Sequence, residues 1–485
     1  MVTESARGSF TRSKTLTDLL PPPPAHLLLL GQETGAVADG LLEQGYTVTA
    51  APLFEPHSFA QLPSATRLGI YQVDLSLPQA SSDVFDAVVV LGVSPQIHPL
   101  ALFDQLAQCT AHEGLVLLVG LDPQGPPARV TRWLEYVVTI GTRCGFIQLE
   151  LEADADPIDR GTFVRALRKK EAPRWRLGHL RQSDYPETAV LFQEVFGHPL
   201  SPELWAWKYA NGGGNAVLAR RDGVLVAHYG GMYRDVMLCG KPDWVFQICD
   251  VMVHPKERGV MTRRGPFLLT AATSAEIYGP LGFGFPNDRH VLLAEKVGLY
   301  AEVGQMREVR WEPASPRFRL GTRLRVVARD SAASRVLVES LWAAMAQDLR
   351  HDVVGVRDWA FLEHRYFKHP HHQYEVLSVT SRLTGKSLGL IVLRRWETSC
   401  ELVDVIAPLA NLPVLVDQAR RLTGLWGLSS LYCWITKNHL PHFLVAEGKE
   451  LPLNVTIPTS CWTNDPRADV FKDRWWLMSG DTDFR

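Results

Sequence analysis

One stretch of the chain brings together residue types that could carry acid–base and anion-binding chemistry. Asp250 ends an apolar run that reads as a strand, and His254, Arg258 and Gly259 follow in the loop before the next helix. Free backbone N–H groups at the start of a helix bind anions, and Arg258 adds a positive charge. Asp250, or His254 with its ordinary pKa of about 6.5, could take a proton from a nucleophile. The residues therefore predict an anion-binding loop beside a base. A strand-end acid that caps a loop N–H and an ordinary loop histidine are the alternatives.

The elements around this stretch resemble the GNAT superfamily of N-acyltransferases over residues 174–318. The resemblance rests on a strand and helix at 181–196, a helix and hairpin at 205–229, and the strand, loop and helix at 250–261. It implies an α+β fold that binds acyl-CoA, or the phosphopantetheine of an acyl-carrier protein, with Asp250 or His254 assisting catalysis. The positions that it assigns to the coenzyme are Val251, Val253, Arg258, Gly259, Met261 and Asn287.

Two positions depart from the pattern of that family. Met261 stands where the family has a second glycine, so its side chain would crowd the phosphates. Ala294 stands where many members have a tyrosine that protonates the departing thiolate. A thiolate whose conjugate acid has a pKa of about 8.5 gains from protonation near neutral pH but does not require it. Transfer of an acyl group to an amine therefore stays the leading hypothesis.

A weak internal repeat links this region to the rest of the chain. Lys208-Tyr209 recurs as Arg365-Tyr366, and Asp250 recurs as Asp404 after a similar apolar strand. The repeat predicts two GNAT-like copies, at residues 174–318 and 319–485, similar to the tandem arrangement of double-GNAT proteins. The loop after Asp404 has neither arginine nor glycine, which favours a structural or acceptor-binding role for the second copy.

Other polar residues of the second copy have two interpretations each. Asp481 and Asp483 lie on an apolar terminal segment and could line a cleft shared by the copies, or be solvated acids at the chain end. The histidines between residues 364 and 372 are dense enough to suggest metal ligands. No cysteine or acidic ligand pattern accompanies them, so we predict no metal site.

Residues 25–170 alternate short apolar strands with helices, which predicts a parallel α/β sheet. The runs Leu27–Gly35 and Gln72–Leu75, with a closing antiparallel hairpin near residues 146–167, resemble a class I S-adenosylmethionine-dependent methyltransferase. The resemblance implies a Rossmann-like domain whose cofactor would lie near Gly31, Gly35 and Asp74.

Two departures weaken that cofactor site. Gln32 and Glu33 stand where the family has a small residue and glycine, and Pro52 stands where it has the acid that binds the ribose. Proline neither accepts through a side chain nor donates from its backbone. We therefore expect a pseudoenzyme domain that keeps the fold without S-adenosylmethionine, with cofactor binding as the alternative.

Composition excludes several classes of protein. The 485 residues carry a net charge of −2, so no global positive field attracts nucleic acid. No apolar run approaches the ~20 residues that cross a bilayer. Seven scattered cysteines without a Cys-x-x-Cys pair predict reduced thiols and a cytoplasmic protein. Residues 1–24 lack periodicity and end in four prolines, which predicts a flexible N-terminal segment.

The prediction is thus a multidomain α/β protein with a Rossmann-like domain followed by two GNAT-like domains. Its expected function is acyl transfer to an amine of a small molecule or sugar intermediate, with a possible acyl-carrier or pathway protein as partner. Two rivals remain. A non-catalytic scaffold would accumulate the losses at all three sites, and an active methyltransferase would use the GNAT-like domains to recruit its substrate.

Overall fold

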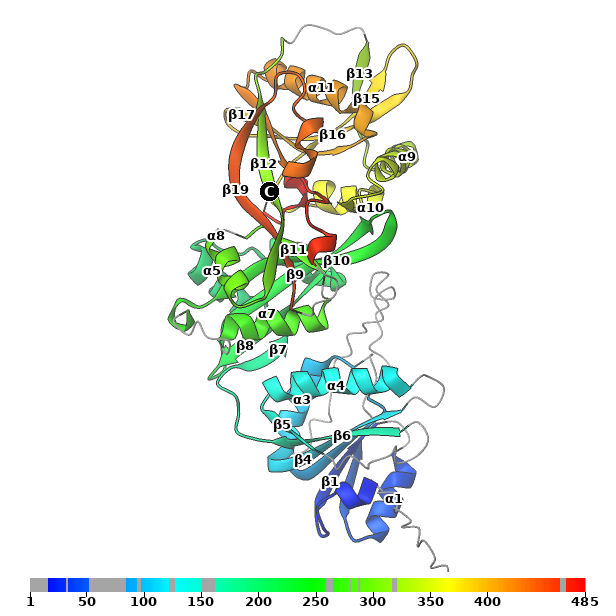
Figure 1. Cartoon of the computed structure of the whole chain (residues 1–485), viewed down its shortest axis with the longest axis vertical. Helices are drawn as coiled ribbons and strands as arrows, with labels where there is room; N and C mark the ends of the chain where they lie inside the picture. Colours follow the sequence, from blue (N-terminus) through cyan, green and yellow to red (C-terminus); the bar gives the residue numbers. More distant parts are fainter. Residues whose placement is uncertain are drawn as a thin grey trace, which may run out of the picture. The chain divides into compact units, whose positions relative to one another are not determined.

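The computed structural model divides the chain into two compact units, residues 1–179 with 218–224, and residues 180–217 with 225–485 (Figure 1). Each unit is described by itself. The residues that the structure describes are 16–31, 34–51, 84–93, 97–121, 127–150, 162–258, 265–279, 281–286, 288–315, 321–462 and 468–484.

The N-terminal unit is built on a six-stranded sheet in the order β2-β1-β3-β4-β6-β5. The first four strands are parallel, and β6 pairs antiparallel with both β4 and β5. The predicted parallel sheet and its closing antiparallel hairpin are therefore present. The strands are β1 (His26–Leu30), β2 (Thr47–Ala51), β3 (Phe85–Leu91), β4 (Thr110–Leu121), β5 (Phe146–Leu149) and β6 (Thr162–Lys169).

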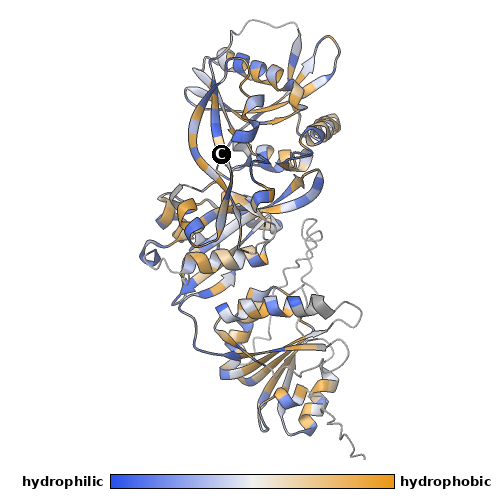
Figure 2. Cartoon of the chain, in the orientation of Figure 1, coloured by the Kyte–Doolittle hydropathy of each residue, from blue (hydrophilic) through white to orange (hydrophobic). Residues whose placement is uncertain are grey.

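Apolar runs make this sheet a buried one. The leucines of β1 and the valines of β3 are almost wholly buried, as expected where a parallel sheet is covered on both faces (Figure 2). Helices α3 and α4 lie side by side, and α4 packs on β4, β5 and β6 (Figure 1). The helices are α1 (Gly35–Glu43), α3 (Pro99–Cys109) and α4 (Pro127–Arg143), with a 3₁₀ turn at Leu16–Leu19 and the short strand β7 (Arg176–His179) near the end of the unit.

The second unit contains two further sheets. In the first, strands run in the order β11-β10-β9-β14-β20, with β8 beside β9. Its strands are β8 (Gly214–Arg221), β9 (Val224–Leu238), β10 (Lys241–Val253), β11 (Gly282–Gly284), β14 (Val353–Gly355) and β20 (Trp475–Trp476). The helices that belong to the same stretch of chain are α5 (Tyr185–Phe196), α6 (Pro202–Tyr209), α7 (Pro266–Ile277) and α8 (Asp288–Lys296).

The second sheet runs in the order β13-β15-β16-β17-β18-β12-β19. Its strands are β12 (Tyr300–Trp311), β13 (Thr322–Val326), β15 (Glu375–Ser381), β16 (Ser387–Arg395), β17 (Ser399–Ile406), β18 (Ser430–Thr436) and β19 (Lys449–Ser460). The helices are α9 (Ala332–Asp348), α10 (Trp359–Leu362) continued by a π-helical turn (Glu363–Phe367), and α11 (Leu412–Leu425), with a 3₁₀ segment, η7, at Lys437–His442.

The two sheets exchange strands across the predicted boundary near residue 318. Strand β12 precedes that position yet pairs with β18 and β19, beside which it runs as a long strand (Figure 1). Strands β14 and β20 follow it yet extend the first sheet through β9. The order helix, helix, three strands, helix, strand, helix, strand occurs from α5 to β12 and again from α9 to β19, with two differences: β14 lies between the first two helices of the second run, and η7 takes the place of α8.

Apolar packing explains why residues 225–485 stay together. One buried cluster takes residues from β9, β10, β11, β12, β18 and β19, among them Val236, Phe283, Met306 and Trp434.

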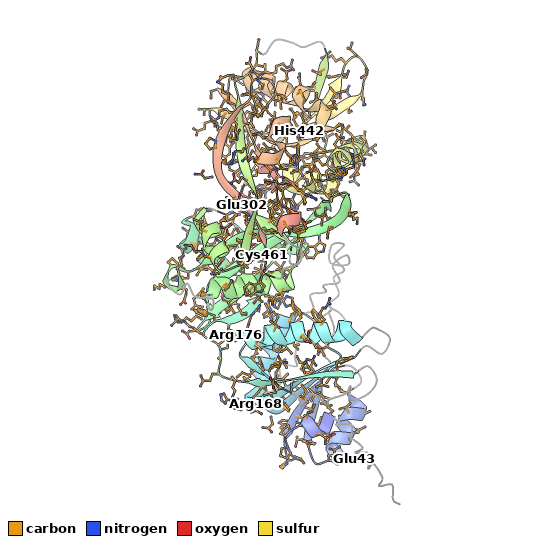
Figure 3. All side chains as sticks on the ribbon, in the orientation of Figure 1. Glu43, Arg168, Arg176, Glu302, His442 and Cys461 are labelled. Carbon is orange, nitrogen blue, oxygen red and sulfur yellow. The ribbon has the colours of Figure 1, made fainter. Side chains whose placement is uncertain are left out.

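None of the described helices is long and apolar enough to span a bilayer. All seven cysteines are free thiols, and Cys461 is one of them (Figure 3). Its Sγ contacts the carbonyl oxygen of Gly298.

Candidate active site

A cavity of about 530 Å³ opens where the parallel strands β10 and β11 stop pairing. Their last paired residues are Ile248 and Gly284, after which β11 ends while β10 continues to Val253. The cavity is lined from both strand ends, from α5 and α6, from the histidine-rich turn after residue 368, and from the C-terminal residues Asp483 and Phe484. Pockets of this volume are typical of small-molecule sites.

Asp250 lies in this wall at a bulge in β10. The register with β9 shifts between Cys249 and Met252, and Asp250 has a φ of 48°, a conformation that a non-glycine residue rarely adopts. A bulge inserts an extra residue and redirects its side chain. The bulge thus explains how Asp250 reaches the cavity from within a strand.

Helix α6 supplies the two partners of this carboxylate. Ser201 caps the helix by accepting from the N–H of Leu204, so that Lys208 and Tyr209 lie in the last turn. Lys208 Nζ donates to Asp250 Oδ1 at 2.8 Å, and the Tyr209 hydroxyl donates to Asp250 Oδ2 at 2.7 Å. Lys208 also donates to Asp483 Oδ2 at 2.7 Å. One ammonium therefore bridges two carboxylates from opposite ends of the unit's sequence.

The charges of this group are strongly coupled because they are buried. Burial raises the pKa of Asp250, but the attraction of Lys208 and the hydrogen bonds from Lys208 and Tyr209 outweigh it and hold the pKa below its usual value. Burial lowers the pKa of Lys208, and the attraction of Asp250 and Asp483 raises it further than burial lowers it. Asp250 is consequently a carboxylate at neutral pH and a weaker base than a solvated aspartate.

The sequence-predicted residues have different positions. Val251 lines the cavity with Asp250, whereas His254 is not among the lining residues and pairs with Glu194 on α5 at 3.1 Å. Arg258 Nε donates to the carbonyl oxygen of Val253 at 2.9 Å. The remaining predicted coenzyme positions, Gly259, Met261 and Asn287, lie outside the described residues.

Sequence reasoning missed Tyr300 as a lining residue. Its hydroxyl forms a short hydrogen bond with that of Tyr229 in an apolar cluster that also contains Ala294. Burial raises the pKa of Tyr300, so its hydroxyl keeps a proton at neutral pH. Position 294 is alanine instead of the family's tyrosine, but the phenol of Tyr300 lies in the same cluster. No signal in the sequence links the two positions.

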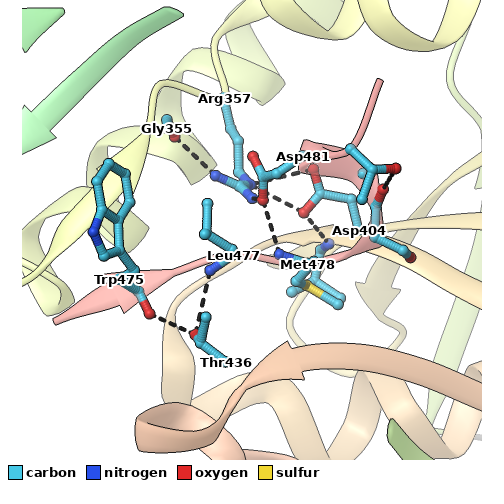
Figure 4. A network of polar contacts seen from close by, with 12 residues as sticks. Gly355, Arg357, Asp404, Thr436, Trp475, Leu477, Met478 and Asp481 are labelled. Carbon is cyan, nitrogen blue, oxygen red and sulfur yellow. Dashed lines mark hydrogen bonds and ion pairs between the residues drawn. The ribbon is translucent and has the colours of Figure 1, made fainter. Parts of the chain in front are cut away.

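In the sequence, Lys208 and Tyr209 stood out only because the pair recurs as Arg365-Tyr366. In the structure, a second group of buried charges around Asp404 corresponds to the group around Asp250 (Figure 4). The hydroxyl of Tyr366 donates to Asp404 Oδ2 at 2.7 Å, as that of Tyr209 does to Asp250. Here Arg357 takes the cation's place: its Nε donates to Asp404 at 3.0 Å and its Nη2 to Asp481 at 2.6 Å, with all three side chains fully buried. The residues of this second group do not line the cavity described above. The C-terminal segment, which contains Asp481, packs against them instead.

Among the described residues, Cys249, Asp250 and Asp483 come close enough to suggest a metal site, with one potential ligand atom of each within 4.8 Å of the others. Lys208 already bonds to both carboxylates. Burial raises the pKa of the Cys249 thiol, which disfavours the thiolate that a metal needs. The donor set therefore does not fit a resident cation.

The cofactor positions predicted in the N-terminal unit are partly described. Gly31 follows β1, and a Cβ at this position would lie 2.8 Å from the carbonyl oxygen of Leu91, so the close approach to β3 requires glycine. Gly35 begins α1 and has open space around it. Asp74 lies outside the described residues.

Protonation of buried histidines should destabilise the second unit in mild acid. Burial lowers the pKa of His290 to about 4, whereas the unfolded chain has a value of about 6.5. Below pH 6.5 the unfolded state binds the proton first, so stability is full above that pH and falls toward pH 4. For His290 the loss should reach about 2 kcal/mol by pH 5. Urea unfolding at pH 7.5 and pH 5 measures it, and His290→Phe should show a smaller loss; equal losses would contradict the assignment.

Comparison with known proteins identifies part of the chain. Residues 176–285 match the acetyltransferase (GNAT) domain model, so the chain contains such a domain around β8 to β11. No curated protein matches the chain.

Solved structures resemble the chain more weakly. A probable N-acyltransferase of Enterococcus faecalis aligns with a TM-score of 0.47 and 13% identity, over 59% of this chain and 72% of its own. A GCN5-related N-acetyltransferase of Anabaena variabilis aligns with a TM-score of 0.45 and 12% identity, over 58% of this chain and 72% of its own. N-myristoyltransferase of Saccharomyces cerevisiae aligns with a TM-score of 0.40 and 10% identity, over 60% of this chain and 80% of its own. At TM-scores below 0.5 these similarities carry no argument about the rest of the chain.

Proposed function

We propose that this protein is an N-acyltransferase that moves an acyl group from a thioester to an amine. The thioester would be acyl-CoA, or the phosphopantetheine thioester of an acyl-carrier protein, and the acceptor a small molecule or sugar intermediate. The observation that supports this best is the cavity at the ends of β10 and β11, two strands that lie inside the segment matching the acetyltransferase domain model.

The free edge of β10 suits the donor. Beyond Ile248 no described strand pairs with that edge on the β11 side, so an extended amide-containing chain such as pantetheine would run beside Val251 and Val253, where the Val253 carbonyl already accepts from Arg258. Extended ligands add to sheet edges in this way. Arg258 lies just past the strand, and with Gly259 and Met261 it would meet the pyrophosphate, while Asn287 would follow β11.

The remaining groups suit the chemistry. The amine nitrogen would attack the thioester carbonyl carbon after losing a proton toward Asp250, directly or through water. The carbon–sulfur bond then breaks, and the thiolate takes a proton from Tyr300, a buried phenol in the wall, which regains one as the nitrogen loses its second proton to form the amide. Holding both reactants in one cavity supplies much of the rate. We do not assign the base to His254, because its ring is held by Glu194 outside the cavity lining.

We also propose that residues 174–318 and 319–485 are two GNAT-like copies, the second structural. The repeated element order and the repeated tyrosine–aspartate hydrogen bond support this. For residues 25–170, the sheet order with one antiparallel strand supports a methyltransferase-like domain. Of the segment predicted to be flexible, residues 1–15 lie outside the described residues, whereas Leu16–Leu19 form a 3₁₀ turn and Leu20 is buried in the core of the unit, which does not fit a flexible segment there.

Native mass spectrometry of the full-length protein with acetyl-CoA and S-adenosylmethionine at equal concentrations tests the proposal. We expect one acetyl-CoA per chain, weakened about tenfold or more in Arg258→Ala because a charge-assisted contact to phosphate is lost. Arg221→Ala, at an exposed arginine that pairs with Asp222, is the matched control and should bind normally. Binding of S-adenosylmethionine alone would contradict acyl transfer and favour an active methyltransferase.

A further inference from the structure

Among the described residues that line the cavity, the carboxylates outnumber the lysine and arginine side chains. Asp250 and Asp483 face a single cation, Lys208, and the three side chains are 6%, 12% and 3% exposed. Burial lowers the pKa of His290 and His372 to about 4 and keeps these rings neutral.

The other lining histidines do not offset that charge by contact with the carboxylates. His369 Nδ1 accepts from the backbone N–H groups of His371 and His372, and burial lowers its pKa to about 2, so the ring is neutral. His371 Nε2 bonds to the hydroxyl of Ser201, and His198 Nδ1 to the carbonyl of Pro199. Two carboxylates facing one lysine among the described lining residues favour a cationic ligand.

Asp483 is the carboxylate that is free to bind that ligand. Both oxygens of Asp250 already accept hydrogen bonds, from Lys208 and Tyr209. Asp483 accepts from Lys208 through Oδ2 only, and in the described part of the chain its Oδ1 has no partner. A ligand cation at Oδ1 would also lie near Asp250, since the two carboxylates approach within 4.8 Å.

A second polar group in the wall also lacks a partner. Because His369 Nδ1 is an acceptor, its Nε2 carries the hydrogen, and this buried N–H meets no acceptor among the described residues. A buried donor without a partner costs free energy. A ligand oxygen would satisfy it.

Much of the rest of the wall is apolar, and four phenylalanines belong to it. Phe192 and Phe196 come from α5, Phe285 from the end of β11, and Phe484 from the C-terminus. Four phenylalanine rings around one charged end fit a ligand with an apolar body and a single polar end.

The position of Asp483 is set by the anchored residues before it. Asp481 is held by Arg357 at 2.6 Å and by Arg234 at 3.1 Å (Figure 4). Arg365 donates to the carbonyl oxygens of Gly480 at 2.8 Å and Thr482 at 3.2 Å. The C-terminal segment that packs against Tyr366 and Asp404 thus also places its last aspartate, Asp483, in the cavity wall.

We propose that the cavity takes a primary ammonium carried on an aromatic or apolar body with one oxygen acceptor, and that Asp483 is the residue that selects it. This rests on the proposed function and names the acceptor class for the same site. Asp483 would hold the ammonium beside Asp250, where the proton must leave before attack.

Calorimetric titration of the full-length protein without any acyl donor tests this with four compounds of related shape. We expect 2-amino-1-phenylethanol to bind about tenfold or more tightly than 1-phenylethane-1,2-diol, which lacks the charge, and than mandelate, which reverses it. Ethanolamine, which lacks the ring, should also bind at least about tenfold more weakly. Equal binding of the amine and the diol, or preference for mandelate, would overturn the charge assignment. Equal binding of ethanolamine would overturn the apolar body.

Substitution tests the role of Asp483. Asp483→Asn should weaken 2-amino-1-phenylethanol about tenfold and leave the diol unchanged, whereas Asp483→Glu should restore part of the affinity. Because Lys208 keeps Asp250 as a partner in Asp483→Asn, the fold should survive, which an unchanged melting temperature checks. Asp473→Asn, on the same segment but exposed, is the matched control. Undiminished amine binding in Asp483→Asn would overturn the proposal. If acetyl-CoA binds while none of the amines does, this inference fails and the proposed function survives.

Discussion

Replacing Asp250 by asparagine should lower kcat for acyl transfer about 100-fold or more, the range that a positioned proton acceptor contributes. The substitution keeps the size of the side chain and its bulge in β10. It removes the carboxylate that would receive the proton of the ammonium. Lys208 would retain Asp483 as an anionic partner, so the cation is not left buried alone.

The measurement is release of free CoA from acetyl-CoA with 2-amino-1-phenylethanol as acceptor. KM for acetyl-CoA should change little, because the donor contacts proposed for β10 are backbone groups. Asp243→Asn is the matched control, on the same strand but exposed and bonded only to its neighbour's N–H. A variant with wild-type kcat would remove Asp250 from the mechanism.

The second large effect concerns stability: Arg357→Met should lower the unfolding free energy of the second unit by about 3–5 kcal/mol. The guanidinium donates to Asp404, Asp481 and the carbonyl of Gly355, and it is fully buried. Without this guanidinium, the buried carboxylates of Asp404 and Asp481 lose the arginine that both of them share. Breaking a buried pair from one side costs more than the pair contributed, because the remaining charge has no water around it.

Urea unfolding followed by tryptophan fluorescence gives the free energy, since several tryptophans of this unit are buried. Arg395→Met is the control: its pair with Glu375 is half exposed, and its loss should cost less than about 1 kcal/mol. A double variant, Arg357→Met with Asp404→Leu, should recover part of the loss by removing one orphaned charge. Equal destabilisation by Arg357→Met and Arg395→Met would show that the buried network contributes little.

Local sequence patterns predicted the elements well because they depend on neighbouring residues. The apolar runs that became β1 and β3 and the helix that became α3 are legible from composition alone. The sequence singled out Asp250 as an acid at the end of an apolar run, but β10 continues past it to Val253 and Asp250 lies at a bulge within the strand. His254 was singled out as a histidine in the same loop, yet its ring pairs with Glu194, which is distant in the sequence.

The partners of Asp250 could not be read in the same way. Lys208 is 42 residues and Asp483 more than two hundred residues away from it, and only the folded chain brings the three together. The repeat marked Lys208 and Tyr209 as recurrent but said nothing of what they touch. Tyr300 had no marker at all.

The sequence by itself determined the kinds of elements, their order along the chain, and the short motifs that recur between its second and third parts. These follow from periodicity and spacing, which act over a few residues. Only the tertiary structure decided that β12 joins the second sheet, that β14 and β20 join the first, and that the last residues of the chain complete the cavity. Such choices depend on burying apolar faces and pairing buried charges across the whole unit, and those energies have no local signature in the sequence.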